Sequence, residues 1–504
     1  MELSEIRDLR DWLAVARQMD AVTDVRGAHW DLEIGTISQL NYRRPRPQAM
    51  LFDDIVDYPE GSRVLTGSVS DARRTAMTLR LGTEFTDREL VDALQGRSVE
   101  WAEQAPKFDP IPVNSAPVFD NVVDGNATDL LAFPVPRWNE IDGGRFIGTG
   151  CMVITSDPET GIVNGGAYRM QVQDEGRTAT VHAIPGKHGA QHIARWIELD
   201  GRAPVTVSLG HDPLLFLLAG IEVPTGISEL NYAGAITGSP LEVVTSEVTG
   251  LPIPVSSEIV VEGWLDPKLT FPEGPFGEWT GHAITSDTPV IAIDVARVLH
   301  RDDPILLGAP PGKPPHDYSY MRTAVKSAMI QDAVQGTGVP GVAGIWAHEA
   351  GGGRMFIAVA VEQRYCGHAR QVGSLTAQVH AAAYMNRFVV VVDHDVDPTS
   401  LEDVIWAMCT RCDPEADIDI MRRSWGSKAD PLLVDQSAPY NSRAVIDATR
   451  PYERFDEFPM VATASPELLD QVRTKWAHVL GDAPTSHTTG TVQGSTSGTM
   501  MDGM

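Results

Sequence analysis

The amino-acid sequence predicts a mixed fold of helices and sheets, of the α/β or α+β class, with more than one domain. First, its 504 residues exceed what one hydrophobic core usually serves. Second, the central third carries short runs rich in β-branched residues, such as CMVITSD, TATVHAI and EIVVEGWLD, separated by glycine and proline turns. Third, strand-like and helix-like segments alternate after His300, as in RMFIAVAVE, HARQVGSLTAQVHAAAYMN and FVVVVD.

The first two predicted domains cover residues 1–120 and 121–305. The first begins with an amphipathic helix over about 20 residues and continues as an α/β region, with turns at Pro59 and Gly61. A stretch rich in proline, asparagine and glycine, from about 110 to 150, indicates the junction. The β-rich runs that follow predict a barrel-like second domain.

Residues 306–481 predict a C-terminal α/β domain with a parallel pair of strands. The apolar run 389–392 indicates a buried strand, and Ser400 with Asp403 predicts a capping box on the next helix.

A last helix is predicted to begin at Ser465 and Pro466 and to end at Gly481. Its apolar face predicts a docking element. The residues of that face are Leu468, Leu469, Val472, Trp476 and Val479. Residues 482–504 are rich in Ser, Thr and Gly, so we expect a disordered tail.

Composition excludes several classes of protein. Hydrophobic residues make up 42% and charged residues 21%, as in ordinary folded proteins. A formal charge of −28 disfavours nucleic acid and anionic membranes as partners, so an anionic ligand needs its own local Arg, Lys or metal. The start shows no long apolar run, so we expect a cytoplasmic protein without a membrane span. Cys409 and Cys412 form a C-x-x-C on a predicted helix, which we interpret as two free thiols rather than a zinc site.

Two segments contain candidate chemistry. Glu273 and Glu278 lie five residues apart in a segment with three glycines and a proline, which predicts a shaped loop; the alternative is an exposed acidic turn. Asn164, Arg169, Lys187 and His188 lie in glycine-rich turns, and Glu229 follows in a third. Together these types suit a phosphate-bearing ligand and a divalent cation such as Mn²⁺ or Mg²⁺, although a surface Arg and a turn His are the alternatives.

Two further patterns are interpreted as structural. The run from Gly336 to Gly341 fits G-x-G-x-x-G, but a helical segment precedes it and Pro340 disfavours a following helix. Asp393, His394 and Asp395 look like a metal site but are expected to end a strand. The glycines at 351–353 predict a flexible loop beside the site.

These stretches, in this order, resemble the UbiD-like decarboxylases. The similarity runs from about Pro134 to Arg454 and includes the Asp142-Gly-Gly junction, ITSDPETG, GHDP, EIVVEGWLDP, VVDHDVDP and DVIWAMCTRCDP. The resemblance implies a middle domain that binds prenylated FMN, a homo-oligomer, and a flavin prenyltransferase that supplies the cofactor.

The resemblance also assigns residues. It implies that Asn164, His188 and Glu229 bind a divalent metal at the cofactor phosphate, with a potassium ion beside it. Arg169, Glu273 and Glu278 match the family's catalytic set, with Glu278 as the proton donor. Lys187 and Arg387 are further candidates for cofactor binding, although Arg387 stands where relatives often carry Lys.

The implied activity is the reversible, non-oxidative decarboxylation of an aromatic, heteroaromatic or α,β-unsaturated acid. Trp279 and the residues His316, Tyr318, Tyr320 and Arg322 offer a surface for a flat ring or a second polar group. Benzoates, cinnamates, furan or pyrrole carboxylates and polycyclic acids such as a phenazine carboxylate all remain open. The alternatives are a non-catalytic flavin- or metal-binding partner protein of the same fold and a metal-dependent hydrolase.

Overall fold

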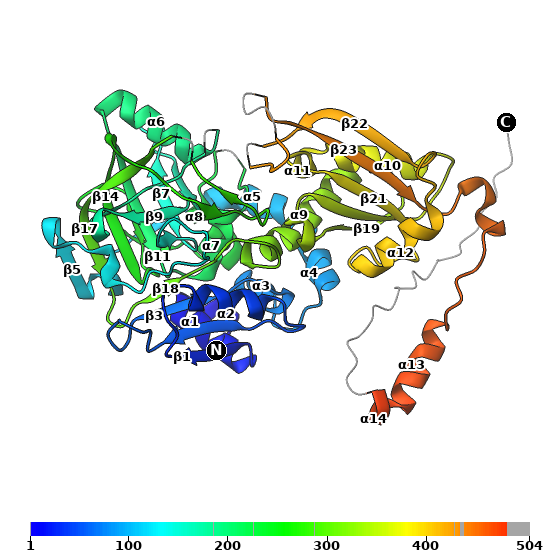
Figure 1. Ribbon diagram of the computed structural model, residues 1–504, viewed down its shortest axis with the longest axis horizontal. Coiled ribbons are helices and arrows are strands. Elements are labelled where there is room, and N and C mark those ends of the chain that lie inside the picture. Colours follow the sequence, from blue (N-terminus) through cyan, green and yellow to red (C-terminus); the bar gives the residue numbers. More distant parts are fainter. Residues whose placement is uncertain are drawn as a thin grey trace.

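The computed structural model describes residues 2–184, 186–224, 226–286, 288–427, 429–433 and 438–480. Figure 1 shows an N-terminal part below a β-rich middle part, with a C-terminal sheet beside them. Helices and sheets are mixed throughout, which confirms the predicted fold class. No helix in the described part of the chain is long and apolar enough to cross a membrane.

The N-terminal part is a four-stranded sheet with helices packed on it. The strands lie in the order β1 (Val22–Arg26), β2 (Ala49–Asp53), β3 (Arg63–Thr66) and β18 (Ile305–Leu307). The helices are α1 (Leu9–Gln18), α2 (Glu33–Tyr42), α3 (Ala72–Thr78), α4 (Asp87–Leu94) and α5 (Arg97–Gln104). Helix α1 confirms the predicted amphipathic start, because Leu9, Trp12 and Leu13 are buried. Strand β18 arrives from far along the chain and pairs in parallel with β3.

The middle part contains an antiparallel sheet of six strands and a smaller sheet of three. The larger has the order β5 (Asn121–Asp124), β17 (Val290–His300), β14 (Ile259–Phe271), β11 (Ala203–Leu209), β7 (Met152–Ser156) and β8 (Val163–Gly166). The smaller has the order β10 (Thr178–Ala179), β9 (Met170–Gln173) and β6 (Phe146–Gly148). A bridge between Thr180 and Ala292 links the two, and both share one core, as a barrel-like arrangement requires.

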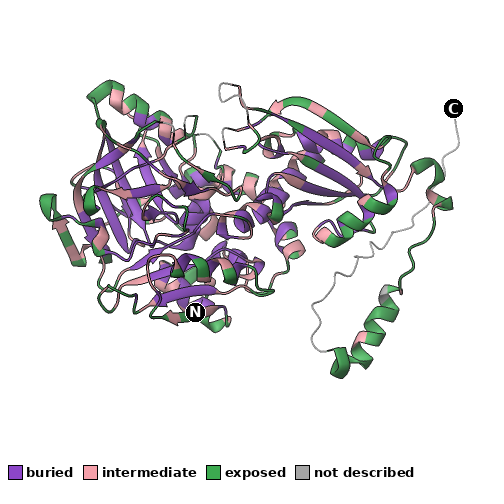
Figure 2. Ribbon diagram, in the orientation of Figure 1, coloured by how far each residue is buried: buried purple, intermediate pink, exposed green. Residues whose placement is uncertain are grey.

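Helices and short strands surround these sheets. The helices are α6 (His188–Asp200), α7 (Pro213–Gly220) and α8 (Glu229–Thr237). Strands β13 (Pro252–Pro254), β12 (Glu242–Thr245) and β4 (Ile111–Pro112) form a minor sheet, and β15 (Phe276–Gly277) pairs with β16 (Ala283–Ile284) as a hairpin. Figure 2 shows that the large sheet is mostly buried.

The C-terminal part is a five-stranded mixed sheet covered on both faces. Its order is β19 (Val342–Ala347), β20 (Phe356–Val361), β21 (Phe388–Asp393), β23 (Tyr440–Ala448) and β22 (Ile418–Trp425), and the inner three are parallel. Helices α10 (His368–Gln378) and α11 (His380–Ala383) cover one face and α12 (Leu401–Arg411) the other. The predicted buried strand is confirmed, and Ser400 caps α12 by accepting a hydrogen bond from the Asp403 N–H.

Helix α9 (Asp317–Gln335) connects the parts. The buried carboxylate of Asp317 accepts hydrogen bonds from Tyr42 Oη (2.7 Å) and from the Gly67 and Val69 N–H groups (3.0 and 2.9 Å). The end of α9 packs in the core of the C-terminal sheet through Ile330 and Val334.

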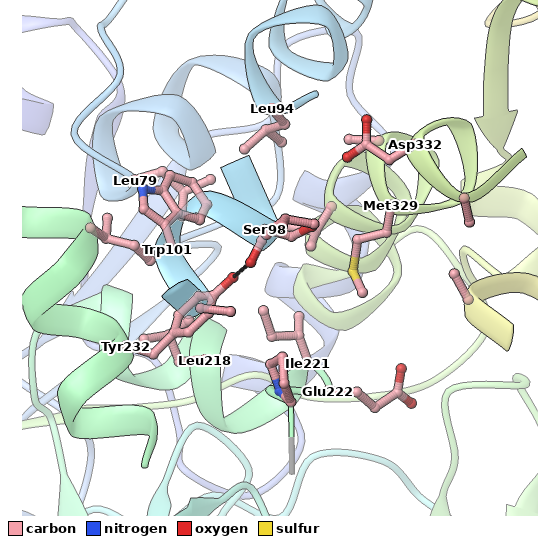
Figure 3. A pocket seen from close by; sticks show the side chains of 18 of the residues that line it. Leu79, Leu94, Ser98, Trp101, Leu218, Ile221, Glu222, Tyr232, Met329 and Asp332 are labelled. Atoms are coloured by element: carbon pink, nitrogen blue, oxygen red, sulfur yellow. Dashed lines mark hydrogen bonds between the residues drawn. The ribbon is translucent and has the colours of Figure 1, made fainter. Parts of the chain in front are cut away.

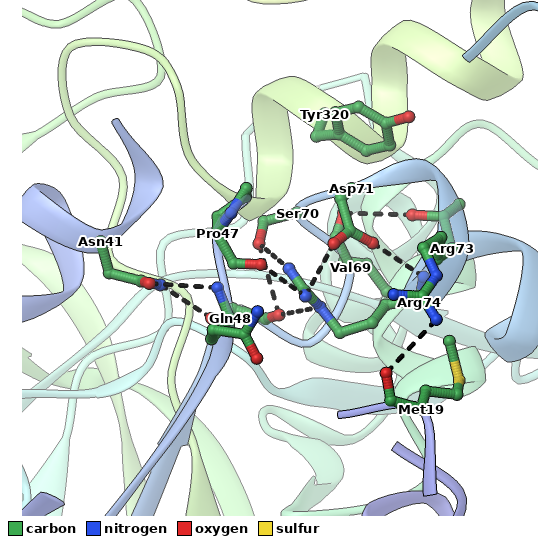
Figure 4. A network of polar contacts seen from close by, with 12 residues as sticks. Met19, Asn41, Pro47, Gln48, Val69, Ser70, Asp71, Arg73, Arg74 and Tyr320 are labelled. Atoms are coloured by element: carbon green, nitrogen blue, oxygen red, sulfur yellow. Dashed lines mark hydrogen bonds and ion pairs between the residues drawn. The ribbon is translucent and has the colours of Figure 1, made fainter. Parts of the chain in front are cut away.

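A buried arginine stabilises the loop that holds Asp317 (Figure 4). Arg74 is fully buried and donates hydrogen bonds to the carbonyls of Gly67 (2.9 Å) and Pro47 (2.7 Å) and to Ser70 Oγ (2.8 Å). It also pairs with Asp71 at 2.7 Å. A buried cation with several partners holds these turns in one arrangement.

The structure also tests the patterns interpreted as structural. The Gly336 to Gly341 run lies between α9 and β19, a helix-to-strand connection, so it is not a dinucleotide fingerprint. Asp393 and Asp395 pair with Arg411 at 2.7 and 2.9 Å, which supports a structural strand end. Cys409 and Cys412 are free thiols.

The last predicted helix is interrupted. Helix α13 (Pro466–Lys475) and α14 (Ala477–Leu480) are separated at Trp476, and Ser465 caps the first. All five predicted apolar residues are exposed, and Figures 1 and 2 show both helices away from the sheets. Gly481 and the predicted tail at 482–504 lie outside the described residues.

Candidate active site

The hairpin β15–β16 positions the two predicted catalytic glutamates. Glu273 precedes β15 and Glu278 follows it, where the Glu278 N–H donates to the His282 carbonyl at 2.9 Å. The Asp142-Gly-Gly junction packs against this hairpin: the Gly143 N–H donates to the Pro275 carbonyl at 2.8 Å. A Cβ on Gly143 would lie 1.9 Å from the Gly274 carbonyl oxygen, so only glycine permits this approach.

Arg169 lies between the two glutamates. Its Nε and Nη2 donate to Glu273 Oε2 at 3.0 and 2.7 Å, and its Nη1 donates to Glu278 Oε1 at 2.6 Å. The exposed side-chain fractions are 0% for Glu273, 8% for Arg169 and 20% for Glu278. Glu273 is therefore the buried anchor of the guanidinium, and Glu278 is the carboxyl that solvent or a ligand can reach.

A histidine that sequence reasoning missed joins this group. His182 Nδ1 lies 2.9 Å from Glu273 Oε2 and 3.2 Å from Arg169 Nη2. Burial raises the pKa of Glu273, but the hydrogen bonds and charges of His182 and Arg169 outweigh it and leave that pKa below its ordinary value. Glu273 thus stays ionised at neutral pH. The only local signal for His182 was its place in TATVHAI, between Arg169 and Lys187.

The three predicted metal ligands converge from three elements. Asn164 lies on β8, His188 begins α6 and Glu229 begins α8. Tyr168 Oη links two of these elements, because it accepts from Asn164 Nδ2 at 3.5 Å and from the Gly189 N–H at 3.2 Å.

Glu229 is the carboxylate of the trio and is buried. Its Oε2 accepts from the Gly165 N–H at 2.7 Å, and burial raises its pKa to about 7. An amide, an imidazole and a buried carboxylate are a suitable donor set for a hard divalent cation. Among the described residues, no three His, Cys, Asp or Glu side chains form a metal-binding group. The trio has only two side chains of these types, His188 and Glu229, and its third member, Asn164, is an amide.

The other predicted residues are placed as follows. Lys187 directly precedes α6, and its side chain is half-exposed. Its Nζ lies 3.8 Å from Glu222 Oε1. Arg387 precedes β21 and pairs with Asp430, a partner within the C-terminal part.

Of the residues predicted to form a ring surface, Trp279, Tyr318 and Arg322 lie together. The guanidinium carbon of Arg322 lies 5.8 Å from the ring centroid of Trp279 and 5.1 Å from that of Tyr318. Tyr318 Oη donates to the Thr149 carbonyl at 2.7 Å, and Tyr320 Oη donates to Asp87 at 2.5 Å. His316 is buried at the start of α9.

An apolar hollow lies among the helices next to Glu222 (Figure 3). Its volume is about 640 Å³, and α4, α5, α7, α8 and α9 contribute to its wall. Trp101, Leu218 and Met329 line it, and Tyr232 Oη donates to the Ser98 carbonyl at 3.1 Å across it. Glu222 lies at one edge.

Comparison with known families gives three matches along the chain. Residues 14–94, 111–314 and 319–448 match the N-terminal, Rift-related and C-terminal domains of 3-octaprenyl-4-hydroxybenzoate carboxy-lyase. The chain is 30% identical to pyrrole-2-carboxylic acid decarboxylase of Pseudomonas aeruginosa, over 94% of this chain and 99% of the relative. It is 29% identical to a phenolic acid decarboxylase of Streptomyces sp., over 90% and 93%.

Solved structures show the same fold. Vanillic acid decarboxylase of Sedimentibacter hydroxybenzoicus, in an open form, superposes with a TM-score of 0.78 at 25% identity, covering 94% of this chain and 99% of the other. The enzyme HmfF from Pelotomaculum thermopropionicum, solved with FMN, gives 0.79 at 24% identity, covering 92% and 99%.

Proposed function

Because this chain belongs to the UbiD family of carboxy-lyases, we propose that it decarboxylates an aromatic, heteroaromatic or α,β-unsaturated acid, reversibly and without oxidation, using prenylated FMN. The observation that carries the proposal is the placement of Arg169 between a fully buried and a partly exposed glutamate. HmfF, solved with FMN and in another form with prenylated FMN, supports the choice of cofactor.

Each residue has a separate role in the proposed reaction. Arg169 donates hydrogen bonds to the substrate carboxylate, while ionised Glu273 and His182 hold the guanidinium in place. When the bond to the carboxyl carbon breaks, its electron pair stays on the substrate, and the flavin supplies the electron sink. Glu278, in its acid form, then donates a proton to the vacated carbon and is reprotonated from solvent.

Asn164, His188 and Glu229 are proposed to hold Mn²⁺ or Mg²⁺ at the flavin phosphate, with K⁺ beside it. Their donor types suit this role, and burial of Glu229 favours a cation as its partner. Lys187 and Arg387 are proposed as further contacts of the cofactor.

We also propose that the chain is a homo-oligomer. Helices α13 and α14 expose apolar side chains, as a helix does when its partner belongs to a second copy. An evolved dimeric form of HmfF shows that this fold supports a dimer.

The decisive experiment compares two preparations. Protein co-expressed with a flavin prenyltransferase is expected to be coloured and to release CO₂ from at least one acid in a panel of benzoates, cinnamates, pyrrole and furan carboxylates and polycyclic acids. Protein expressed alone is expected to be nearly inactive. Equal activity of both would contradict the cofactor proposal, and a flavin-loaded protein inactive on every acid would favour the non-catalytic alternative.

A further inference from the structure

Four cationic side chains gather around one glutamate outside the proposed catalytic group. Glu222 accepts hydrogen bonds from Lys326 Nζ at 2.7 Å and Arg354 Nη2 at 2.9 Å, and Lys187 Nζ lies 3.8 Å away. Arg322 is near enough for the charge of Glu222 to act on it and to oppose the lowering of its pKa by burial. We call these five residues the Glu222 cluster. Its formal charge is three positive, four cations less one carboxylate, within a chain of charge −28.

The cations of the Glu222 cluster have unused hydrogen-bond donors. The side chains of Lys326 and Arg354 are each 6% exposed. Arg322 Nε and Nη1 and Arg354 Nη1 are buried and have no hydrogen-bond partner among the described residues. Buried guanidinium N–H groups without acceptors are costly, and an oxyanion would satisfy several at once.

The pKa values of two cations in the cluster indicate the same deficit of negative charge. Burial lowers the pKa of Lys326 to about 8, and the charge of Arg354 contributes to that shift. Burial and the charge of Arg354 also lower the pKa of Arg322 to about 10. A bound anion would relieve both. The side chains of Glu222 and Lys187 are 41% and 50% exposed, so the cluster is open to solvent on one side.

The cluster adjoins the proton donor. The guanidinium carbons of Arg322 and Arg354 lie 5.8 and 6.0 Å from the ring centroid of Trp279, the residue after Glu278. The glycine loop at 351–353 permits this packing, because a Cβ on Gly352 would lie 2.6 Å from the Trp279 ring. Trp279 therefore lies near both arginines and directly follows the proposed proton donor in the chain.

We propose that the Glu222 cluster binds a second acidic group of the substrate, and that this enzyme prefers aromatic acids with two such groups. The inference rests on the proposed function, which places the reacting carboxylate at Arg169 and Glu278. A flat ring lying against Trp279 could direct one carboxylate to Arg169 and the other to Arg322.

An oxyanion at this cluster has two sources, a substrate carboxylate and the phosphate of the flavin. The substrate is favoured because both arginines lie near the ring of Trp279, whereas Tyr168 links the elements that carry the proposed metal ligands Asn164 and His188. The experiment separates the two sources.

The test measures binding and turnover separately on flavin-loaded full-length protein. Dissociation constants are obtained by calorimetry for pyrrole-2-carboxylate with pyrrole-2,5-dicarboxylate, and for benzoate with benzene-1,3- and benzene-1,4-dicarboxylate. Wild type, Arg322→Gln and Arg322→Lys are compared. Arg364→Gln, on an exposed arginine paired with Glu362, is the matched control. Arg354→Gln, at the other arginine beside Trp279, is a second variant should Arg322→Gln unfold.

We expect at least one dicarboxylate to bind tenfold or more tightly than its monoacid. Arg322→Gln should reduce this preference on the order of tenfold to a hundredfold, the loss of a charge-assisted pair, with flavin retained. Arg322→Lys should restore part of it, and Arg364→Gln should keep it.

Several results would overturn the inference. The first is a wild type that binds no dicarboxylate more tightly than its monoacid. The second is an Arg322→Gln variant that binds the monoacid and the dicarboxylate more weakly by the same factor. The third is loss of flavin from that variant, which would assign the cluster to the flavin phosphate. If the preference is present but no acid releases CO₂, the binding inference stands and the proposed function fails.

Discussion

Replacing Glu278 by Gln removes an acid while keeping the shape of the side chain. Arg169 Nη1 donates to Glu278 Oε1 at 2.6 Å, and the carbonyl oxygen of Gln can accept the same bond. Arg169 also keeps its two bonds to Glu273, at 3.0 and 2.7 Å, so the guanidinium should not move. The variant therefore tests the loss of the acidic proton without a change in the position of Arg169.

The expected loss follows from general acid catalysis. A positioned acid contributes roughly 10²–10⁴-fold, so kcat should fall by this factor, about 3–5 kcal/mol in the activation free energy. The Gln carbonyl is a neutral acceptor for Arg169, as the acid form of Glu278 is, so KM should change by less than about tenfold. Flavin content should equal that of wild type.

The assay is steady-state CO₂ release from flavin-loaded enzyme, with flavin content measured by absorbance. Glu273→Gln is the matched control, because it makes the same chemical change on the buried anchor. That variant should impair the positioning of Arg169 and hence raise KM as well as lower kcat. Near wild-type kcat for Glu278→Gln would refute the assignment of the proton donor, and Glu273 would be the next candidate.

Four further results are expected. His188→Ala should lose bound metal, measured by elemental analysis, together with flavin; full retention of both would contradict the metal assignment. The free energy of urea unfolding should differ most between Glu273→Gln and wild type at neutral pH, because folding lowers the pKa of Glu273. The contribution of Glu273 to stability is present above pH 4.5 and is lost as pH falls through the folded pKa. A difference in free energy that is the same at every pH would contradict this. Arg74→Met should lower the free energy of unfolding by about 3–5 kcal/mol, since it leaves Asp71 and two carbonyls without their buried partner; a loss under about 1 kcal/mol would contradict its role. Truncation after residue 464 should reduce the assembly size in light scattering, and an unchanged mass would refute docking by α13 and α14.

Local patterns predicted local features well. The amphipathic start, the buried strand at 389–392 and the cap at Ser400 depend on neighbouring residues, and the structure confirms each. The rejection of the Gly336 to Gly341 run also depended on its neighbours and was right. Long-range pairing was not predictable in this way. Strand β18 joins β3 about 240 residues away, and no periodicity in either segment indicates its partner.

In the candidate site, too, some residues were predictable from the sequence and others were not. The sequence, through family resemblance, selected Arg169, Glu273 and Glu278, and the structure brings these three into direct contact. It did not select His182, because a single histidine in a β-rich run is more often structural. The Glu222 cluster was missed because its members lie on four segments, and only the fold reveals that three cations share one carboxylate.

The central claim is a non-oxidative decarboxylation completed by a proton from the enzyme. The most direct test runs the reaction in D₂O with flavin-loaded wild type and counts CO₂ and deuterium together. We predict one CO₂ and one deuterium at the vacated carbon for each acid consumed, without uptake of O₂, and loss of both signals in Glu278→Gln. CO₂ release without deuterium at that carbon, or in proportion to O₂ consumed, would contradict the account.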